Sequence, residues 1–116
     1  MNSNIRGVEI LNIKKITAVV ATDDILAFGV NLYLTQKNIR DIAVVGFNNS
    51  PLAEYQRPPL TSVDINAQKI GYYTAKLLID KLENNIKETY YIIETSLIER
   101  ESTGNLSGNN CNSSQC

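Results

Sequence analysis

The sequence predicts an α/β fold with a largely parallel sheet flanked by helices. Two short runs, 16–21 and 42–47, are apolar and rich in β-branched residues, which is typical of strands that are covered on both faces. Segments with helical patterning follow the strands, so strands and helices alternate along the chain. The 116 residues suit one domain or part of one, and a hydrophobic content of 43% permits a packed core.

The first half of the chain is expected to run from helix to strand to helix. Apolar residues within 5–13 have the spacing of the last turns of a helix, and residues 16–21 form the first strand. Asp24 is the expected N-cap of the next helix, because its carboxylate can accept from the free N–H groups of the first turn. That helix, 25–36, carries no charge and is apolar all round, which predicts burial on all sides.

The second half is expected to contain a strand, a turn, a short helix, a strand, a long helix and a final strand. In order, these elements are predicted at 42–47, 48–51, 52–56, 61–65, 66–84 and 90–98. Asn66 is expected to cap the long helix, and Gly71 inside it indicates close backbone packing. From Glu101 onward the chain is rich in Asn, Ser and Gly, so we expect disorder there, with 105–116 as a polar tail.

Composition excludes several classes of protein. The 11 basic and 12 acidic residues give a net charge of −1 without a basic run, which argues against a nucleic-acid-binding surface. No apolar stretch reaches the roughly 20 residues of a membrane span, and residues 1–7 do not resemble a secretory signal. We therefore expect a cytoplasmic protein. Cys111 and Cys116 are expected to be reduced and incidental, with a labile surface disulfide as the alternative.

The sequence does not predict an enzyme, a metal site or a cofactor. It contains no histidine, which removes the common catalytic triads and the commonest metal ligand. No P-loop, dinucleotide-binding or nucleophile-elbow motif occurs. Asp23 and Asp24 can be read as a catalytic carboxylate pair, but adjacent residues at a strand-to-helix turn point in different directions, which disfavours that role.

Polar pairs follow the first two strands. Asp23 and Asp24 end the first strand, whereas Asn48 and Asn49 end the second. In parallel sheets both pairs stand at the carboxyl edge, where ligands bind. Carboxylates and amides suit a polyhydroxylated ligand such as a sugar. Asp24 is better explained as a helix cap and Asn49 as a turn residue, whereas Asp23 and Asn48 are equally compatible with ligand contact and with a structural role.

Five blocks of sequence resemble the lactose-repressor (LacI/GalR) family in order and spacing. They are Thr17–Gly29, Ile42–Ala53, Pro58–Val63, Ile70–Gly71 and Leu97–Thr103. The resemblance spans roughly residues 17 to 104. It implies part of a two-lobed, periplasmic-binding-protein-like (type I) fold that reads sugars or purines, with residues 66–84 in the N-terminal lobe and most of 1–104 in the C-terminal lobe.

The resemblance also implies roles for particular residues. The positions of Asp23 and Asn48 face the ligand in the family. Asn48 departs from the usual Asp there, and the run Phe47–Ser50 is similar to the maltose-operon branch, which implies a maltose-like effector. The family forms its dimer through the helix after the first block and the loop near the Pro-Pro pair. The corresponding apolar residues are Ile25, Phe28, Leu32, Leu52 and Tyr55.

The implied function is effector sensing and homodimerisation in an allosteric transcriptional repressor. The family's helix-turn-helix domain, which binds operator DNA, is not found in this sequence, so we expect a truncated product or a fragment that does not itself bind operator DNA. We also expect the chain alone to bind sugar weakly or not at all, since the opposite wall of the cleft belongs to the other lobe. A fragment of a periplasmic sugar-binding transport protein is the alternative.

Overall fold

The computed structural model describes residues 16–85 and 87–104. The helix expected within 5–13 and the tail expected at 105–116 lie outside the described residues. The observed elements are β1 (Ala18–Val20), α2 (Asp24–Gln36), β2 (Ala43–Phe47), η1 (Ala53–Tyr55), β3 (Thr61–Asp64), α3 (Ala67–Leu82), β4 (Ser96–Ile98) and η2 (Glu101–Thr103), where η denotes a 3₁₀ helix. Their order and types confirm the predicted α/β class.

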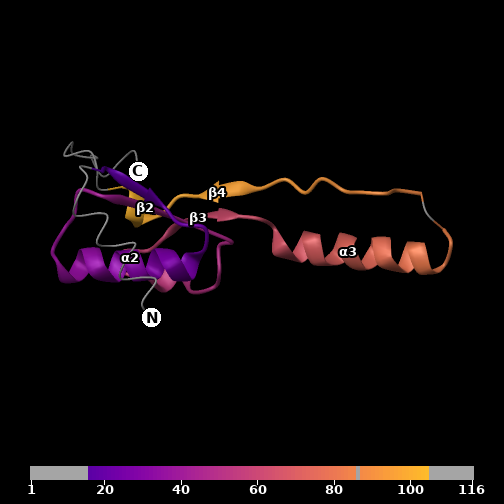
Figure 1. Cartoon of the computed structure of the whole chain (residues 1–116), viewed down its shortest axis with the longest axis horizontal. Coiled ribbons are helices and arrows are strands. Elements are labelled where there is room, and N and C mark those ends of the chain that lie inside the picture. Colours follow the sequence, from indigo (N-terminus) through magenta and orange to yellow (C-terminus); the bar gives the residue numbers. More distant parts are fainter. Residues whose placement is uncertain (1–15, 86, 105–116) are drawn as a thin grey trace, which may run out of the picture.

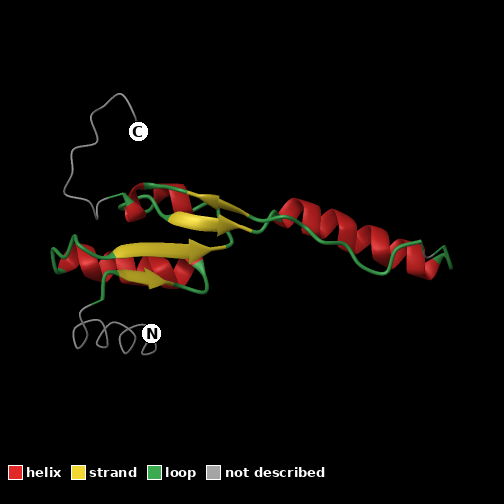
Figure 2. Cartoon of the chain, turned by 90° about the horizontal axis from the view of Figure 1, so that it is seen from above, coloured by secondary structure: helices red, strands yellow, loops and turns green. Residues whose placement is uncertain are grey.

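The four strands form one mixed sheet in the order β1-β2-β3-β4. β1, β2 and β3 are parallel, with Val19 opposite Val44 and Val45 opposite Thr61, whereas β4 is antiparallel to β3. α2 connects β1 to β2 and lies along one face of the sheet (Figures 1 and 2). The carboxyl ends of the three parallel strands therefore meet at one edge.

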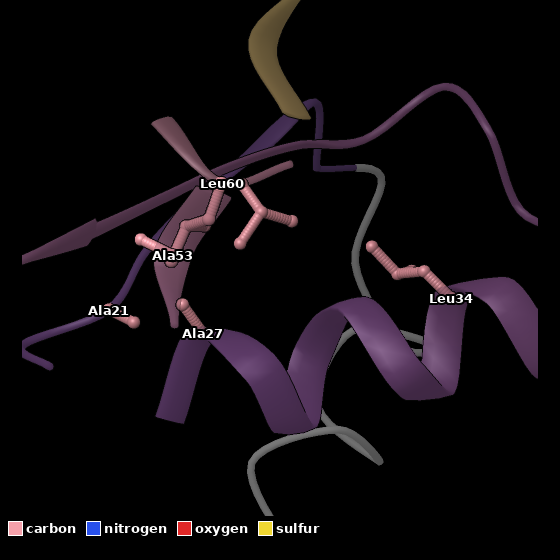
Figure 3. Close-up of a cluster of buried hydrophobic side chains, with 6 residues drawn as sticks. Ala21, Ala27, Leu34, Ala53 and Leu60 are labelled. Carbon is pink, nitrogen blue, oxygen red and sulfur yellow. The ribbon is translucent and has the colours of Figure 1, made fainter. Parts of the chain in front are cut away.

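The core lies between α2 and the sheet and uses small side chains. Ala27 and Leu34 of α2 pack with Val44, Ala53 and Leu60, all of them buried (Figure 3). Alanines at 27 and 53 let the helix and η1 approach closely, because neither has atoms beyond Cβ. The buried positions of α2 are Asp24, Ala27, Asn31 and Leu34, which is one helical stripe.

The prediction that β1 is covered on both faces is wrong for the described chain, whereas α2 is partly exposed, as expected of a helix that needs more burial than one sheet face provides. Val20 of β1 is 73% exposed, and Ile25 of α2 is 71% exposed. β1 is an edge strand, and no described residue covers the face on which Val20 lies. Residues 25–36 of α2, which carry no charge, are thus apolar also on a side that no described residue buries.

Residues 65–85 and 87–95 form an arm that extends away from the sheet (Figures 1 and 2). None of the α3 residues is buried, and the ring of Tyr73 stacks on Tyr91 of the returning segment at 4.5 Å between centroids. Only Ser96–Ile98 of the strand expected at 90–98 joins the sheet. Nothing lies within 4 Å of a Cβ added at Gly71, so the close packing expected there is not observed.

Two further expectations are corrected. Asn66 precedes α3 in a left-handed conformation (φ 58°) and its side chain makes no capping bond. Residues 101–104 are ordered, because the hydroxyl of buried Ser102 accepts from the Thr61 N–H at 2.8 Å and donates to the Val44 carbonyl at 2.6 Å. Among the described helices, none is long and apolar enough to cross a membrane.

Candidate functional site

Asp23 and Asn48 meet at the carboxyl edge of the sheet, where the sequence predicted that the ends of two parallel strands would lie. The Asn48 amide donates to Asp23 Oδ2 at 2.9 Å. Asn48 is exposed and Asp23 is half-buried. Asn48 adopts a left-handed backbone (φ 97°), which Asn tolerates better than most residues. Contact between this pair and a ligand stays a prediction.

The helix cap is Asp23, and the prediction that Asp24 caps α2 is wrong. Asp23 keeps an extended backbone (φ −156°, ψ 151°), and its Oδ1 accepts from the Ile25 N–H at 2.7 Å. A capping side chain needs this non-helical backbone in order to reach the first-turn N–H groups. Asp24 is already helical, so its carboxylate points elsewhere. Asp23 therefore caps α2 at the same edge of the sheet that was predicted to bind ligand.

Asp24 is a buried carboxylate that joins three segments. Its side chain is only 2% exposed, its Oδ2 accepts from the Ser50 N–H at 2.6 Å, and its Oδ1 accepts from the Ser62 hydroxyl at 2.6 Å. Gly46 gives the carboxylate room, since a Cβ there would overlap Asp24 Oδ1. Asp24 thus fixes the start of α2 against β3 and against the turn after β2.

Asn49 is both the turn residue that the sequence predicted and the centre of a second polar cluster. Its backbone is left-handed (φ 47°), and its N–H donates to Ser62 Oγ at 2.9 Å. Its amide donates to Asp64 Oδ2 at 3.1 Å, and its Oδ1 accepts from the Arg100 guanidinium at 2.8 Å. The Asn66 N–H, the Asn49 amide and Arg100 hold the pKa of the Asp64 carboxyl below its ordinary value, although partial burial opposes them.

The sequence reasoning missed Ser62, Asp64 and Arg100. Asp64 ends the third parallel strand, just as Asp23 and Asn48 follow the first two, so the strand-end rule carried a signal for it. Arg100 gave no such signal, because it follows an antiparallel strand whose pairing the sequence did not specify. Ser62 is fully buried inside β3. A single Ser in a strand does not indicate from the sequence which residue its hydroxyl will contact.

The edge can recognise hydroxyl groups. Each carboxylate oxygen of Asp23 accepts one hydrogen bond in the structure and has a second lone pair for a ligand hydroxyl. The side-chain oxygen of Asn48, an exposed residue, accepts no hydrogen bond from the described part of the chain. Within the same residues, no three His, Cys, Asp or Glu side chains are grouped to hold a metal ion. The arrangement therefore offers acceptors to a polyhydroxylated ligand.

A second surface feature, the α2 patch, consists of Ile25, Phe28, Leu32, Leu52 and Tyr55. All five side chains are exposed, with Leu52 and Tyr55 each at 69%. Four of them, all but Leu32, line a depression of about 500 Å³ between α2 and η1. Single exposed apolar residues are common, but a contiguous apolar patch marks an interaction surface.

Comparison with known proteins places this fold and edge in a family. The model of the periplasmic binding protein-like domain matches residues 4–103. The chain therefore belongs to the periplasmic binding protein-like domain family, in the branch that contains transcriptional regulators of the lactose-repressor type.

Three matches illustrate the branch. The chain is 32% identical over 97 residues to the HTH-type transcriptional repressor PurR of Vibrio cholerae, covering 80% of this chain and 29% of that one. It is 32% identical over 88 residues to a lactose operon repressor of Rhizobium radiobacter, covering 73% and 78% respectively. The solved transcriptional regulator CelR–cellobiose complex is 33% identical, with a TM-score of 0.69, over 75% of this chain and 28% of that chain.

The similar proteins are regulators and not enzymes. The chain spans less than a third of the length of the first curated regulators that it matches.

Proposed function

We propose that this chain is the effector-sensing and dimerisation portion of a LacI-type transcriptional repressor, with a sugar as the effector. The observation that carries the proposal is the Asp23–Asn48 pair, joined at 2.9 Å on the carboxyl edge of the sheet. Ligands of open α/β sheets bind at this edge. The Asp23 carboxylate would accept hydrogen bonds from the sugar hydroxyls, and the Asn48 amide would both accept from and donate to them. These bonds would lie close to the plane of each carboxylate or amide group.

The effector class follows from the chemistry of the edge. It presents a carboxylate and an amide, and one similar regulator has been solved with the disaccharide cellobiose. The run Phe47–Ser50, with Asn48 in place of the family's usual Asp, favours a maltose-like disaccharide in this proposal. A purine is the competing effector and is an outcome of the test.

The allosteric part of the proposal concerns the arm. We assign residues 66–84 to a second lobe, because α3 stands clear of the sheet and buries none of its residues within the described chain. A sugar held between the two lobes would favour one relative placement of them, which is how a binding event becomes a switch. The net charge of −1 without a basic run argues against operator binding by this chain, so DNA contact is assigned elsewhere in the regulator.

The dimer is assigned to the α2 patch. Isologous interfaces bury the same surface of both subunits, and an apolar helix with an adjoining depression suits that arrangement. Dimerisation would bury the side of α2 that the sheet leaves open. The absence of charge from residues 25–36 is then explained by two partners of α2, the sheet on one side and a second copy on the other.

Thermal unfolding in the presence of candidate effectors tests the class of ligand. A ligand at ten times its Kd stabilises the folded state by roughly 1.4 kcal/mol, which raises the Tm of a domain of this size by several degrees. Maltose, cellobiose, ribose and hypoxanthine are each added to the purified chain. We expect maltose or cellobiose to raise Tm and hypoxanthine to leave it unchanged.

The matched control for this test is the Asn48→Gly variant. Glycine accepts the left-handed backbone of position 48 but removes the amide, so the fold is kept while the contact is lost. The sugar-dependent rise in Tm should disappear in this variant. A rise in Tm with hypoxanthine alone would contradict the proposed sugar effector. So would the absence of a rise with all four compounds.

A further inference from the structure

The arm is connected to the sheet by two segments, and the outgoing one carries a charged residue. It follows Asp64, the last residue of β3. The returning segment enters β4 at Ser96, which pairs with Asp64, whereas Arg100 lies beyond the other end of β4, within the sheet domain. Asp64 and Arg100 are 36 positions apart in the sequence, yet both contact one side chain, that of Asn49.

The side-chain amide and the backbone N–H of Asn49 are all hydrogen-bonded. Its amide nitrogen donates to Asp64 at 3.1 Å, its amide oxygen accepts from Arg100 at 2.8 Å, and its backbone N–H donates to Ser62 at 2.9 Å. Arg100 also donates to the Leu60 carbonyl at 2.7 Å. Bonds with one ionised partner are stronger than neutral ones, so two of the three contacts are of the stronger kind.

The same turn carries the polar edge. Asn48 directly precedes Asn49, both residues have left-handed backbones, and the Asn48 N–H donates to the Val63 carbonyl at 2.9 Å. Two successive residues in this conformation leave the turn few alternatives, so a displacement of Asn49 also displaces Asn48. Asn49 thus contacts the outgoing arm connection through Asp64, contacts the sheet domain through Arg100, and adjoins the predicted ligand pair.

We propose that Asn49, Asp64 and Arg100 form a clamp that sets the placement of the arm relative to the Asp23–Asn48 edge. Asn49 acts as a positioning residue: it holds Asn48 on one side and the outgoing arm connection on the other, and Arg100 fixes Asn49 to the sheet. Coupling between two sites is reciprocal, so a movement of the arm shifts Asn48 as much as a ligand at Asn48 shifts the arm. The proposal rests on the proposed function only in the identity of the ligand at that edge.

The ionised state of Asp64 supports the clamp. The Asn66 N–H, first, and the Asn49 amide, second, lower the pKa of the Asp64 carboxyl, so the group is charged at neutral pH. The Asn66 N–H donates to Asp64 Oδ1 at 2.7 Å and the Asn49 amide uses Oδ2, so the two carboxylate oxygens serve the arm and the edge separately. This division lets a double exchange of side chains restore the clamp.

The experiment measures the distance between the arm and α2 by pulsed electron spin resonance. Spin labels are attached to Gln36→Cys and Lys81→Cys, two exposed positions, in the full chain with Cys111→Ser and Cys116→Ser. The labelled chain should give a narrow distance distribution. In Asn49→Asp two carboxylates face each other where the 3.1 Å bond was, so the distribution should broaden.

The exchange variant Asn49→Asp/Asp64→Asn should narrow the distribution again. The amide at position 64 then donates to the carboxylate at position 49, its oxygen still accepts from the Asn66 N–H, and the carboxylate still accepts from Arg100. A merely structural effect of either single change would not be rescued by adding the other. Asn84→Gly is the matched control, because Asn84 has a left-handed backbone (φ 55°) at the far end of α3, and it should leave the distribution unchanged.

The outcomes decide the proposal without any sugar. A broad distribution in the unmodified labelled chain, an unchanged one in Asn49→Asp, or an exchange variant as broad as the single one would overturn the clamp. If Asn49→Asp does not fold by circular dichroism, Arg100→Gln and Asp64→Asn take its place, and both must broaden the distribution. Failure of every sugar to raise Tm would instead remove the proposed effector and leave the clamp standing.

Discussion

Gly46 occupies a position in β2 where any side chain would strike its neighbours. A Cβ at this position would overlap the Asp24 carboxylate and lie 2.7 Å from Leu60 Cδ2, and both of these residues are buried. Gly46→Ala should therefore lower the free energy of unfolding by about 1–3 kcal/mol, which is the usual cost of overpacking. Urea denaturation followed by circular dichroism measures the difference.

The control for Gly46 is Gly71→Ala. A Cβ at Gly71 meets nothing within 4 Å, and the residue lies inside α3. Alanine should therefore be neutral or stabilising by up to about 1 kcal/mol, since it loses less backbone entropy than glycine in a helix. Equal losses in both variants would show that the crowding around Asp24 is not what makes Gly46 necessary.

Asp64 makes the free energy of unfolding depend on pH in the acid range. Its folded pKa lies below the ordinary value of 3.8, chiefly because of the Asn66 N–H and then the Asn49 amide. The stability that this lowering provides is fully present above pH 3.8 and is lost as the pH falls through the folded pKa. The advantage of the natural chain over Asp64→Asn in unfolding free energy should be constant near neutrality and shrink below about pH 4.

Denaturation of the two proteins at a series of pH values between neutrality and strong acid measures this difference. Parallel stability curves throughout would show that Asp64 has the same pKa in the folded and unfolded chain. Asn49→Ala should also reduce the acid dependence, since it removes the second largest cause of the lowering.

Individual residues were harder to predict from the sequence than the elements that contain them. The pattern located the polar end of β1 but assigned the cap to Asp24, because both candidates are aspartates and only the backbone angles separate them. An exposed strand-end residue that contacted only a ligand would cost little stability when replaced by Ala. As the cap, Asp23 now predicts a loss of about 0.5–2 kcal/mol for that variant. The Asn49 contacts join residues 51 positions apart, which no local pattern reports.

At the scale of elements, α2 has an exposed apolar side that binding to another molecule would bury. Its buried stripe faces the sheet, whereas the α2 patch is open. Leu32→Lys places a charge in this patch and should shift a homodimer toward the monomer, because burying an unpaired ammonium in an apolar interface is costly. Sedimentation velocity of the two proteins at several concentrations measures the change.

Leu78→Lys is the control for the α2 patch. Leu78 is also exposed and apolar, but it lies on α3 in the arm. It should leave the association state unchanged if the dimer uses α2. Loss of the dimer in the Leu78 variant alone would move the interface to the arm, and a monomeric natural chain would remove the proposed dimer.

The elements themselves were largely predictable because their signals are local. Alternating helical and strand patterns located α2, β2, β3 and α3 to within a few residues. The strand expected at 90–98 was too long, because apolar β-branched residues at 92 and 93 resemble a strand whether or not a neighbour pairs with them. Pairing is a tertiary property, and the arm draws that segment away from the sheet (Figure 1).

At the scale of the molecule, the sheet edge and the arm define what the chain can do. The parallel pairing of β1 and β2 followed from their apolar character, and it brings their polar ends together with that of β3. The extension of the arm did not follow from the sequence, because the apolar residues of α3 predict burial and the described chain supplies no surface for them. Residues such as Tyr72, Leu78 and Leu82 remain exposed.

The central claim is that a sugar binds at the Asp23–Asn48 pair. The most direct measurement is a titration of the ¹⁵N-labelled chain with maltose and with cellobiose at millimolar concentrations, observed by NMR. The Asn48 side-chain amide and the Ile25 N–H both donate to Asp23, so they report on its two carboxylate oxygens. The account predicts saturable shifts of these two signals by at least one of the sugars, with the Asn84 amide unmoved. Shifts confined to other residues, or no shift at all with either sugar, would contradict it.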